Sequence, residues 1–250
     1  MDKKLSAALI IIGNEILSGR TQDSNMQFLG RELGKIGIFL EEVRVIADNE
    51  DKIIETVHQL RNNYDYIFTT GGIGPTHDDI TSLSIAKAFG VELELHEPSA
   101  KKMKEHYGGN LNEARLKMAH IPSGSSPIET RITSAPGFKI ENVFVLAGVP
   151  MIARAMFDAL SPELSVGPPI ISRYIEALLG EGELANQLEK IQNKFSDVDI
   201  GSYPFFRKGE IGLSVVAKGI NSEAINNIIN EVEKIIKSKN CKYCIDDEVI

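Results

Sequence analysis

The strongest constraint on the fold is an alternation of apolar runs with amphipathic stretches in the N-terminal part of the chain. Residues 5–12 (LSAALIII) are continuously apolar and end at Gly13, which is typical of a strand buried on both faces of a sheet. Residues 38–46 and 64–70 have the composition of two further strands. Strands that alternate with helices join one sheet in parallel, with helices on both faces. We therefore predict a three-layer α/β/α domain with a mostly parallel sheet.

The helices between these strands are predicted at residues 23–37, 49–63 and 81–90, where apolar side chains recur at helical spacing. Asp23 or Ser24 can cap the first of them. In folds of this class the ligand binds in a crevice at the C-terminal ends of the strands. The loops that follow the strands are therefore the candidate site.

The second half of the chain indicates a change of domain. Residues 142–148 and 149–160 repeat the strand and helix pattern, and residues 161–169 (SPELSVGPP) have the composition of a linker. The strands and helices that follow are typical of an α+β domain. We predict a first domain at residues 1–165 and a smaller α+β domain at residues 166–250.

A polar stretch interrupts the first domain. Residues 97–122 predict two short helices, separated by Gly108 and Gly109. A loop rich in Ser and Pro, residues 122–129, follows them. We expect this stretch to form a flap.

The net charge of -8 and the short apolar runs exclude several functional classes. Nonspecific attraction to nucleic acid or to an anionic membrane needs clustered Lys and Arg. No apolar run approaches the roughly 20 residues of a membrane span, and residues 1–17 lack the features of a signal peptide. We expect a cytoplasmic protein without nucleic-acid or membrane partners. Cys241 and Cys244 are expected to be reduced thiols on a terminal strand, because no second ligand pair accompanies them.

The loop at residues 69–81 (TTGGIGPTHDDIT) follows a predicted strand and combines bare backbone with dense charge. Gly71, Gly72 and Gly74 allow backbone N–H groups to approach an anion, and the next helix adds partial positive charge at its N-terminus. Asp78 and Asp79 would repel a phosphate unless a divalent cation, most plausibly Mg²⁺, bridges them. A structural interpretation also fits: a tight turn in which one Asp caps the helix and the other is a solvated charge.

Four segments carry a resemblance to a known family: residues 11–25, 69–81, 144–157 and 180–206. Together they resemble the competence/damage-inducible protein A (CinA) family, whose N-terminal half has the MoaB/Mog-type molybdopterin-binding fold. The last segment resembles the small domain that follows that fold. The resemblance does not extend to the amidase domain of full-length members, so we do not expect nicotinamide-nucleotide deamidation from these residues.

The resemblance implies an activity. Members of the family, and the related domain of eukaryotic FAD synthases, hydrolyse the pyrophosphate of nucleotides such as ADP-ribose or FAD with a divalent metal. Mog-type relatives adenylylate molybdopterin. We expect a Mg²⁺-dependent nucleotide pyrophosphatase that forms a homo-oligomer. A noncatalytic module that binds a pterin or nucleotide, and molybdopterin adenylyl transfer, are the alternatives.

The resemblance also implies roles for single residues. Asp78 and Asp79 would hold the metal, and Asp48 or Glu15 would orient the attacking water; Asp48 could equally be a helix cap. The expected substrate-binding residues are Gly13, Asn14, Gly71, Gly72, Gly74, Thr76, Thr81, Gly148 and Pro150.

Two places depart from the family pattern. Asn14 stands where many relatives have Asp, and an amide supplies no charge to a metal. Residues 147–150 read AGVP where much of the superfamily has Pro-Gly-x-Pro, and no Glu follows. The small domain has been likened to KH modules, but Glu181 and Glu183 would face the phosphates there, so we expect no RNA binding.

Overall fold

The computed structural model describes residues 4–207 and 209–249. The chain divides into two compact units, the first comprising Met1–Gly30 and Phe39–Ser165 and the second Arg31–Ile38 and Val166–Ile250. The segment Arg31–Ile38 groups with the second unit. It is bound there by two backbone hydrogen bonds of 2.9 Å, from the N–H of Gly167 to the carbonyl of Ile36 and from the N–H of Ile170 to that of Gly34.

A six-stranded sheet forms the centre of the first unit, in the order β2-β1-β3-β8-β7-β6. Its strands are β1 (Leu5–Ile12), β2 (Ile38–Ile46), β3 (Tyr66–Thr70), β6 (Ser126–Ile128), β7 (Gly137–Ile140) and β8 (Val143–Leu146). β1, β3 and β8 run parallel, and β7 and β6 continue the sheet antiparallel to their neighbours. The parallel centre follows from the crossover helices between its strands, as the alternating pattern predicts.

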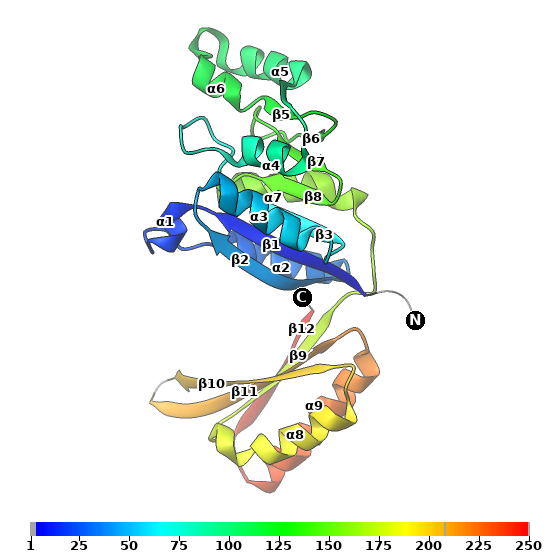
Figure 1. The fold of residues 1–250 in the computed structure, drawn as a ribbon. Helices are drawn as coiled ribbons and strands as arrows, with labels where there is room; N and C mark the ends of the chain where they lie inside the picture. The colour runs from blue at the N-terminus through cyan, green and yellow to red at the C-terminus, as the bar shows by residue number, and fades with distance from the viewer. Residues whose placement is uncertain (1–3, 208, 250) are drawn as a thin grey trace. The chain divides into compact units, whose positions relative to one another are not determined.

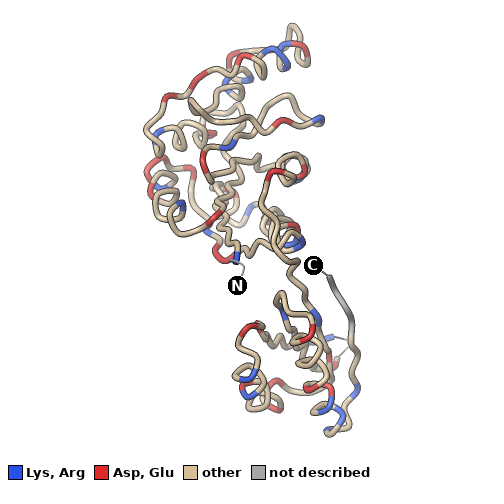
Figure 2. Tube along the Cα trace, turned by 90° about the vertical axis from the view of Figure 1, so that its right-hand side faces the viewer, with Lys and Arg blue, Asp and Glu red and all other residues tan. Residues whose placement is uncertain are grey.

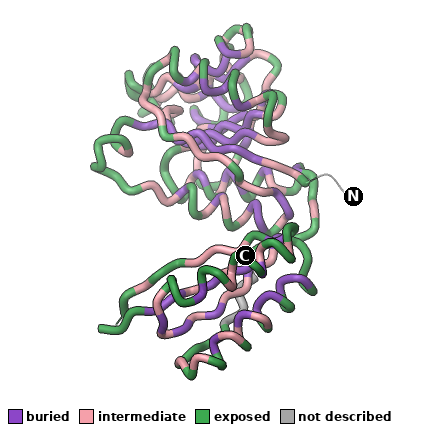
Figure 3. The backbone as a smooth tube through the Cα atoms, turned by 60° about the horizontal axis from the view of Figure 1, so that its bottom comes forward, coloured by how far each residue is buried: buried purple, intermediate pink, exposed green. Residues whose placement is uncertain are grey.

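Helices cover both faces of this sheet (Figure 1). They are α2 (Asn25–Lys35), α3 (Glu50–Leu60), α4 (Thr81–Phe89) and α7 (Pro150–Leu160). The single turn α1 (Asn14–Leu17) follows β1 and has no buried residue. On one face, α3 and α4 pack against alternate residues of β1, β3 and β8. On the other face Phe157 of α7 contacts Phe68 and Phe28, at ring-centroid distances of 6.2 and 5.7 Å. The three-layer α/β/α prediction is confirmed, and Figure 3 shows the buried strands between the helical layers.

A helical arm, residues 93–122, leaves the first unit after α4. It contains β4 (Leu93–Leu95), α5 (Glu97–Tyr107), η1 (Gly108–Asn110), α6 (Glu113–Lys117) and β5 (His120–Pro122). The two predicted short helices are therefore present, and the antiparallel pair β4–β5 joins the two ends of the arm. Met103 and Ala119 are fully buried in a small core of the arm's own.

The second unit is a four-stranded sheet with two helices. After the turn η2 (Ser161–Glu163) of the first unit come β9 (Ile171–Ala177), η3 (Glu181–Glu183), α8 (Ala185–Lys194), β10 (Asp199–Arg207), β11 (Glu210–Gly219), α9 (Ser222–Ser238) and β12 (Tyr243–Val249). The sheet order is β10-β11-β9-β12, with antiparallel pairs throughout. This small α+β unit has the β-α-β-β-α-β order of the ferredoxin-like arrangement. It differs from the KH-like arrangement expected from the resemblance, because β12 returns after α9 and adds a fourth strand beside β9.

Alternation along the strands builds the core of the second unit. Leu213, Val215 and Ala217 on β11 face the helices and are almost fully buried. From α9, Ile225 and Ile228 complete this core at helical spacing. Of the predicted thiols, Cys244 lies on β12 and Cys241 precedes it, and both are free.

Charged residues of both signs occur throughout both units (Figure 2). Figure 2 shows Lys and Arg interspersed with Asp and Glu along the chain. Among the described residues, no helix combines the length and the apolar character needed to cross a bilayer.

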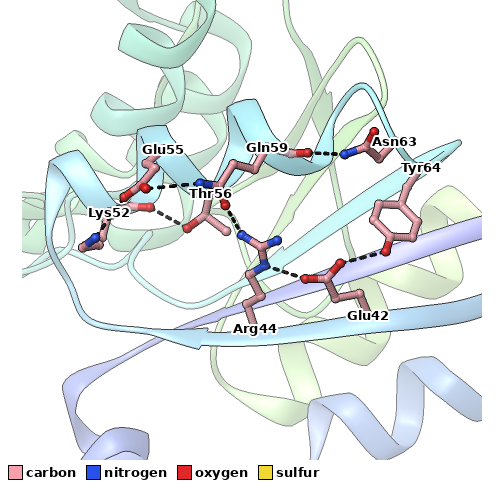
Figure 4. A network of polar contacts seen from close by, with 8 residues as sticks. All are labelled: Glu42, Arg44, Lys52, Glu55, Thr56, Gln59, Asn63 and Tyr64. Carbon is pink, nitrogen blue, oxygen red and sulfur yellow. Dashed lines mark hydrogen bonds and ion pairs between the residues drawn. The ribbon is translucent and has the colours of Figure 1, made fainter.

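A polar network fixes β2 to α3 on the surface of the first unit (Figure 4). Arg44 donates to Oε1 of Glu42 at 2.6 Å and also to Gln59 of α3, while the hydroxyl of Tyr64 donates to Oε2 of Glu42 at 2.7 Å. The Arg44 and Tyr64 bonds hold the pKa of the Glu42 carboxyl below its ordinary value. Glu42 on β2 is therefore linked to α3 through Arg44 and to the turn before β3 through Tyr64.

We expect Glu42→Gln to lower the free energy of unfolding at neutral pH by at most about 1 kcal/mol, because solvent screens this pair. A carboxyl group whose pKa is depressed on folding adds stability above its unfolded pKa, and this stability is lost as the pH falls through its folded pKa. The difference between variant and wild type should therefore shrink in acid. Urea unfolding across a pH series measures it, with Glu105→Gln on the exposed side of α5 as the control. A difference that grows in acid would contradict the assignment.

We expect residues 1–165 to fold alone, because the core cluster over α3 and α4 draws only on residues 8–145. The fragment loses the hydrogen bonds from Gly167 and Ile170, so a longer fragment, residues 1–170, is its matched control. Circular dichroism and urea unfolding should show one cooperative transition for both fragments, with the shorter one slightly less stable. A shorter fragment without cooperative unfolding would contradict this prediction.

Candidate functional site

A cavity of about 630 Å³ opens at the C-terminal ends of β1, β3 and β8. This is the place where parallel α/β sheets bind ligands, and the volume lies in the range of ordinary small-molecule sites. Its lining comes from the loops after these three strands, from the helical arm, from residues 133–136 and from α7.

The backbone of three strand ends converges at Gly71. Its N–H donates to the carbonyl of Leu146 at 3.2 Å, and its φ of 104° is one that residues with a side chain rarely adopt. A Cβ here would lie 2.1 Å from the carbonyl oxygen of Ile12, and a Cβ on Gly148 would lie 3.2 Å from the Cα of Gly71. Only glycine fits at position 71, so the loop is shaped by close backbone contact.

Gly72 turns the loop onto the start of α4. Its φ is 68°, and its carbonyl accepts from the N–H of Thr81 at 2.9 Å. A Cβ on Gly72 would lie 2.1 Å from the Thr81 hydroxyl, which is fully buried and has no hydrogen-bond partner among the described residues. A bare backbone and an unpaired hydroxyl therefore meet at the N-terminal end of a helix.

The two aspartates do not cap α4, so the capping part of the structural interpretation is wrong. The N-cap residue is Ile80, no side chain caps the helix, and its first turn contains no acidic residue. Asp79 instead accepts with Oδ2 from the backbone N–H of Thr76 at 2.8 Å. The two aspartates thus belong to a separate turn, residues 76–79, which we call the acidic turn.

Both carboxylates of the acidic turn approach one hydroxyl. The Oγ1 of Thr76 lies 2.6 Å from Oδ1 of Asp78 and 2.5 Å from Oδ2 of Asp79. A hydroxyl has one hydrogen and donates to one of them at a time. The hydrogen bond from Thr76, followed by one from the Asp78 backbone, lowers the pKa of the Asp78 carboxyl. Two negative groups gathered in this way are stabilised by a nearby cation.

A cation that no sequence motif marks holds the acidic turn. The Nζ of Lys117, on α6 of the helical arm, donates to the carbonyl of Thr76 at 2.9 Å and to that of Asp79 at 2.7 Å. Its charge also lowers the pKa of Asp78, as a minor contribution after the hydrogen bonds. The arm therefore fixes the backbone on which both aspartates stand.

Asp48 joins two strand ends and does not cap a helix. Its Oδ2 accepts from the N–H of Asn14 at 2.8 Å, whereas Asn49 caps α3 by accepting from Lys52 at 3.0 Å. The N–H of Gly13 donates to the carbonyl of Ile46 at 3.1 Å in the same corner. This corner fixes the loop that carries Glu15 into the cavity.

The cavity brings together part of the predicted set. Its lining includes Glu15, Gly71, Gly72, Gly74, Asp79, Gly148 and Pro150. The other predicted residues are not among its described lining: Gly13, Asn14, Asp48, Thr76, Asp78 and Thr81. His77, within the acidic turn, has a side chain that is 97% exposed, and its Nδ1 lies 4.0 Å from Oδ1 of Asp78.

The helical arm contributes a wall of the cavity that the sequence alone does not indicate. Tyr107, Arg115 and Met118 line the cavity, and Thr133 and Pro136 come from the loop before β7. Among the described residues of the lining, Arg115 is the only Lys or Arg. No motif marks these residues, because their approach to the glycine loop depends on how the arm folds back.

The acidic turn supplies two carboxylates, which a divalent cation would have to share with a further ligand. Among the described residues, no group of three or more His, Cys, Asp or Glu side chains could hold a metal ion by itself. Mg²⁺ retains waters and commonly binds one or two carboxylates together with substrate phosphates. Asp78 and Asp79 supply two carboxylates beside a glycine loop, which is the donor set that such shared binding requires.

The chain matches two known families along its length. Residues 8–166 match the family described as "Probable molybdopterin binding domain", and residues 169–243 match "FAD synthase, middle domain". The crystal structure of the protein CinA from Thermoplasma acidophilum has 35% identical residues and a TM-score of 0.60, and covers 63% of this chain and 96% of that one. This likeness confirms the predicted molybdopterin-binding fold.

Relatives in sequence extend over both units. The "CinA-like protein" of Kosmotoga olearia is 32% identical over 96% of this chain and 60% of its own length, and the "Probable FAD synthase" of Caenorhabditis elegans is 31% identical over 94% and 51%. The "Protein PH0439" of Pyrococcus horikoshii is 31% identical over 91% of this chain and 94% of its own length. The chain thus spans between half and two thirds of the first two relatives. It belongs to the competence/damage-inducible protein A family, with a molybdopterin-binding domain followed by a domain like the middle domain of FAD synthase.

Proposed function

We propose that the protein is a Mg²⁺-dependent hydrolase that cleaves the P–O–P bond of a nucleotide such as ADP-ribose or FAD. The observation that carries the proposal is the position of the acidic turn, whose Asp79 lines the same cavity as Gly71, Gly72 and Gly74. A loop for a phosphate and two carboxylates for a cation are the parts that pyrophosphate hydrolysis needs. The relative named "Probable FAD synthase" supports a nucleotide ligand.

In the proposed reaction each group of residues has a separate role. Backbone N–H groups of the glycine loop hold one phosphate, and the start of α4 adds its partial charge. Asp78 and Asp79 would hold Mg²⁺, which when bound neutralises phosphate charge. Glu15 is the carboxylate best placed to orient the attacking water, because it lines the cavity whereas Asp48 is engaged with the backbone of Asn14. Positioning and charge neutralisation, without a covalent intermediate, suffice for this chemistry.

A noncatalytic module that binds a nucleotide or pterin is the second candidate. Asn14 brings no charge to the site and is exposed, and Ala147 occupies a place in the wall where relatives have a rigid Pro. Such a protein would bind the same ligands and leave them intact.

The full chain incubated with Mg²⁺ and ADP-ribose, FAD, NAD or ATP separates these candidates. Hydrolysis at P–O–P releases AMP, which chromatography detects. Release from at least one dinucleotide, abolished by EDTA, is the expected result. Binding without release would favour the noncatalytic module, and release that resists EDTA would contradict the metal.

We expect Asp79→Asn and Asp78→Asn to reduce turnover by about tenfold or more, because an amide oxygen does not replace a metal-binding charge. The fold should be little changed, since Asn can accept the same hydrogen bonds from Thr76. Initial rates at saturating Mg²⁺ measure the effect, with Asp51→Asn in the first turn of α3 as the matched control. Rates within about threefold of wild type for both variants would exclude the metal role.

We expect Lys117→Met to reduce turnover by roughly three- to tenfold, because the acidic turn loses both bonds from the helical arm. Lys117→Arg should recover most of this loss, since a guanidinium can also donate to two carbonyls. Lys101→Met, exposed in the middle of α5, is the control for lost charge on the arm. Equal rates for Lys117→Met and Lys101→Met would show that the two bonds do not position the turn.

A further inference from the structure

We propose that Arg115 of the helical arm binds a second phosphate, so that the cavity selects a diphosphate-linked ligand over a monophosphate. This inference rests on the proposed function and adds the residue that determines its substrate class. The helical arm then serves as half of the binding site and not only as a flap.

The first argument is the balance of charge in the lining. Glu15 and Asp79 bring two carboxylates, and Arg115 is the only Lys or Arg among the described lining residues. The glycine loop, with a cation at the acidic turn, can account for one phosphate. A second phosphate in the cavity would be unfavourable if it were buried without a cationic partner. Among the described lining residues, Arg115 is the cationic side chain that can bind it.

The second argument is that the guanidinium of Arg115 is already oriented. It lies 4.6 Å from the centroid of the Tyr107 ring, and its Nη1 donates to the carbonyl of Asn110. Arg has five N–H donors in a planar fork, so donors remain for a ligand after the Asn110 bond. Stacking and one hydrogen bond reduce the side-chain entropy lost on binding, which favours paired hydrogen bonds to a phosphate.

The third argument is that the arm has a fixed relation to the acidic turn. Lys117 follows Arg115 by two positions on α6, so the two side chains leave the helix in different directions. Lys117 bonds the carbonyls of Thr76 and Asp79, while Arg115 lines the cavity. Asn112 caps α6 by accepting from the N–H of Arg115 at 2.9 Å. The helix α6 therefore positions both the acidic turn, through Lys117, and the guanidinium of Arg115.

The remaining lining indicates what lies beyond the phosphates. Met118, Val149, Ile152 and Met156 present apolar or polarizable surface to the cavity. The volume of about 630 Å³ exceeds what a diphosphate alone needs and suits a nucleoside or sugar attached to it. The ligand class is thus a nucleoside diphosphate with a further group, joined through P–O–P.

Calorimetric titration of the full chain with AMP and with ADP-ribose in a methylene-bridged form, whose P–C–P link cannot be hydrolysed, tests this assignment at constant Mg²⁺ without turnover. Wild type should bind ADP-ribose at least about tenfold more tightly than AMP. Arg115→Gln should weaken ADP-ribose binding by roughly 10- to 100-fold and change AMP binding by less than about twofold. Arg115→Lys should fall between them, because an ammonium keeps the charge and loses the fork.

The matched control is Lys104→Gln, which removes one positive charge from the exposed side of α5 in the same arm. It should leave both affinities within about twofold of wild type. The proposal would be overturned if wild type bound ADP-ribose no more tightly than AMP. It would also be overturned if Arg115→Gln lowered the affinities for ADP-ribose and AMP by the same factor, or if Arg115→Gln and Lys104→Gln changed the ADP-ribose affinity equally.

The outcome is separable from that of the proposed function. Selective loss of ADP-ribose binding in Arg115→Gln supports the second phosphate site even if wild type releases no AMP. Release of AMP by wild type, with unchanged ADP-ribose affinity in Arg115→Gln, would retain the hydrolase and reject this role for Arg115.

Discussion

The site depends on the approach of three backbone segments at Gly71. The carbonyl of Ile12 occupies the space where a side chain would begin, and Gly148 lies against the other side. Parallel strands end at the same edge of the sheet, so the loops that follow them pack closely against one another there. Glycine resolves this crowding, and the same bare backbone is what an anion requires. The packing of the sheet edge therefore leaves a loop of bare backbone beside the cavity.

The acidic turn has the opposite electrostatic character, and the fold controls it through contacts with other segments. Two carboxylates approach the hydroxyl of Thr76, and Lys117 bonds the backbone beneath them. This support fixes the backbone of the turn, whose Asp79 lines the cavity. The Thr81 hydroxyl beside Gly72 is buried and has no partner within the described part of the chain, which is a further sign that the region is not arranged for stability alone.

The helical arm forms one wall of the cavity. Its own small core and the pair β4–β5 make it a defined substructure of the first unit. It reaches the glycine loop through Lys117 and the cavity through Tyr107 and Arg115. A long insertion that carries binding residues on a rigid scaffold is a common origin of specificity in α/β folds. The second unit has a separate core and completes a ferredoxin-like order of its own.

The sequence by itself determined the layers of the first unit and the motif at its centre. Apolar strands such as Leu5–Ile12 and the periodic helix Glu50–Leu60 are local signals, and the glycines of residues 71–74 need no partner to be recognised. Only the tertiary structure decided which polar groups meet. Whether Asp79 caps α4 or closes a turn depends on a shift of one or two residues, and Asp48 differs from a helix cap only through its bond to Asn14. Arg115 and Lys117 reach the site across about forty residues of chain, because the arm folds back at β4–β5. Local propensity does not encode such long-range approach, since it arises from packing between segments that are distant in the chain.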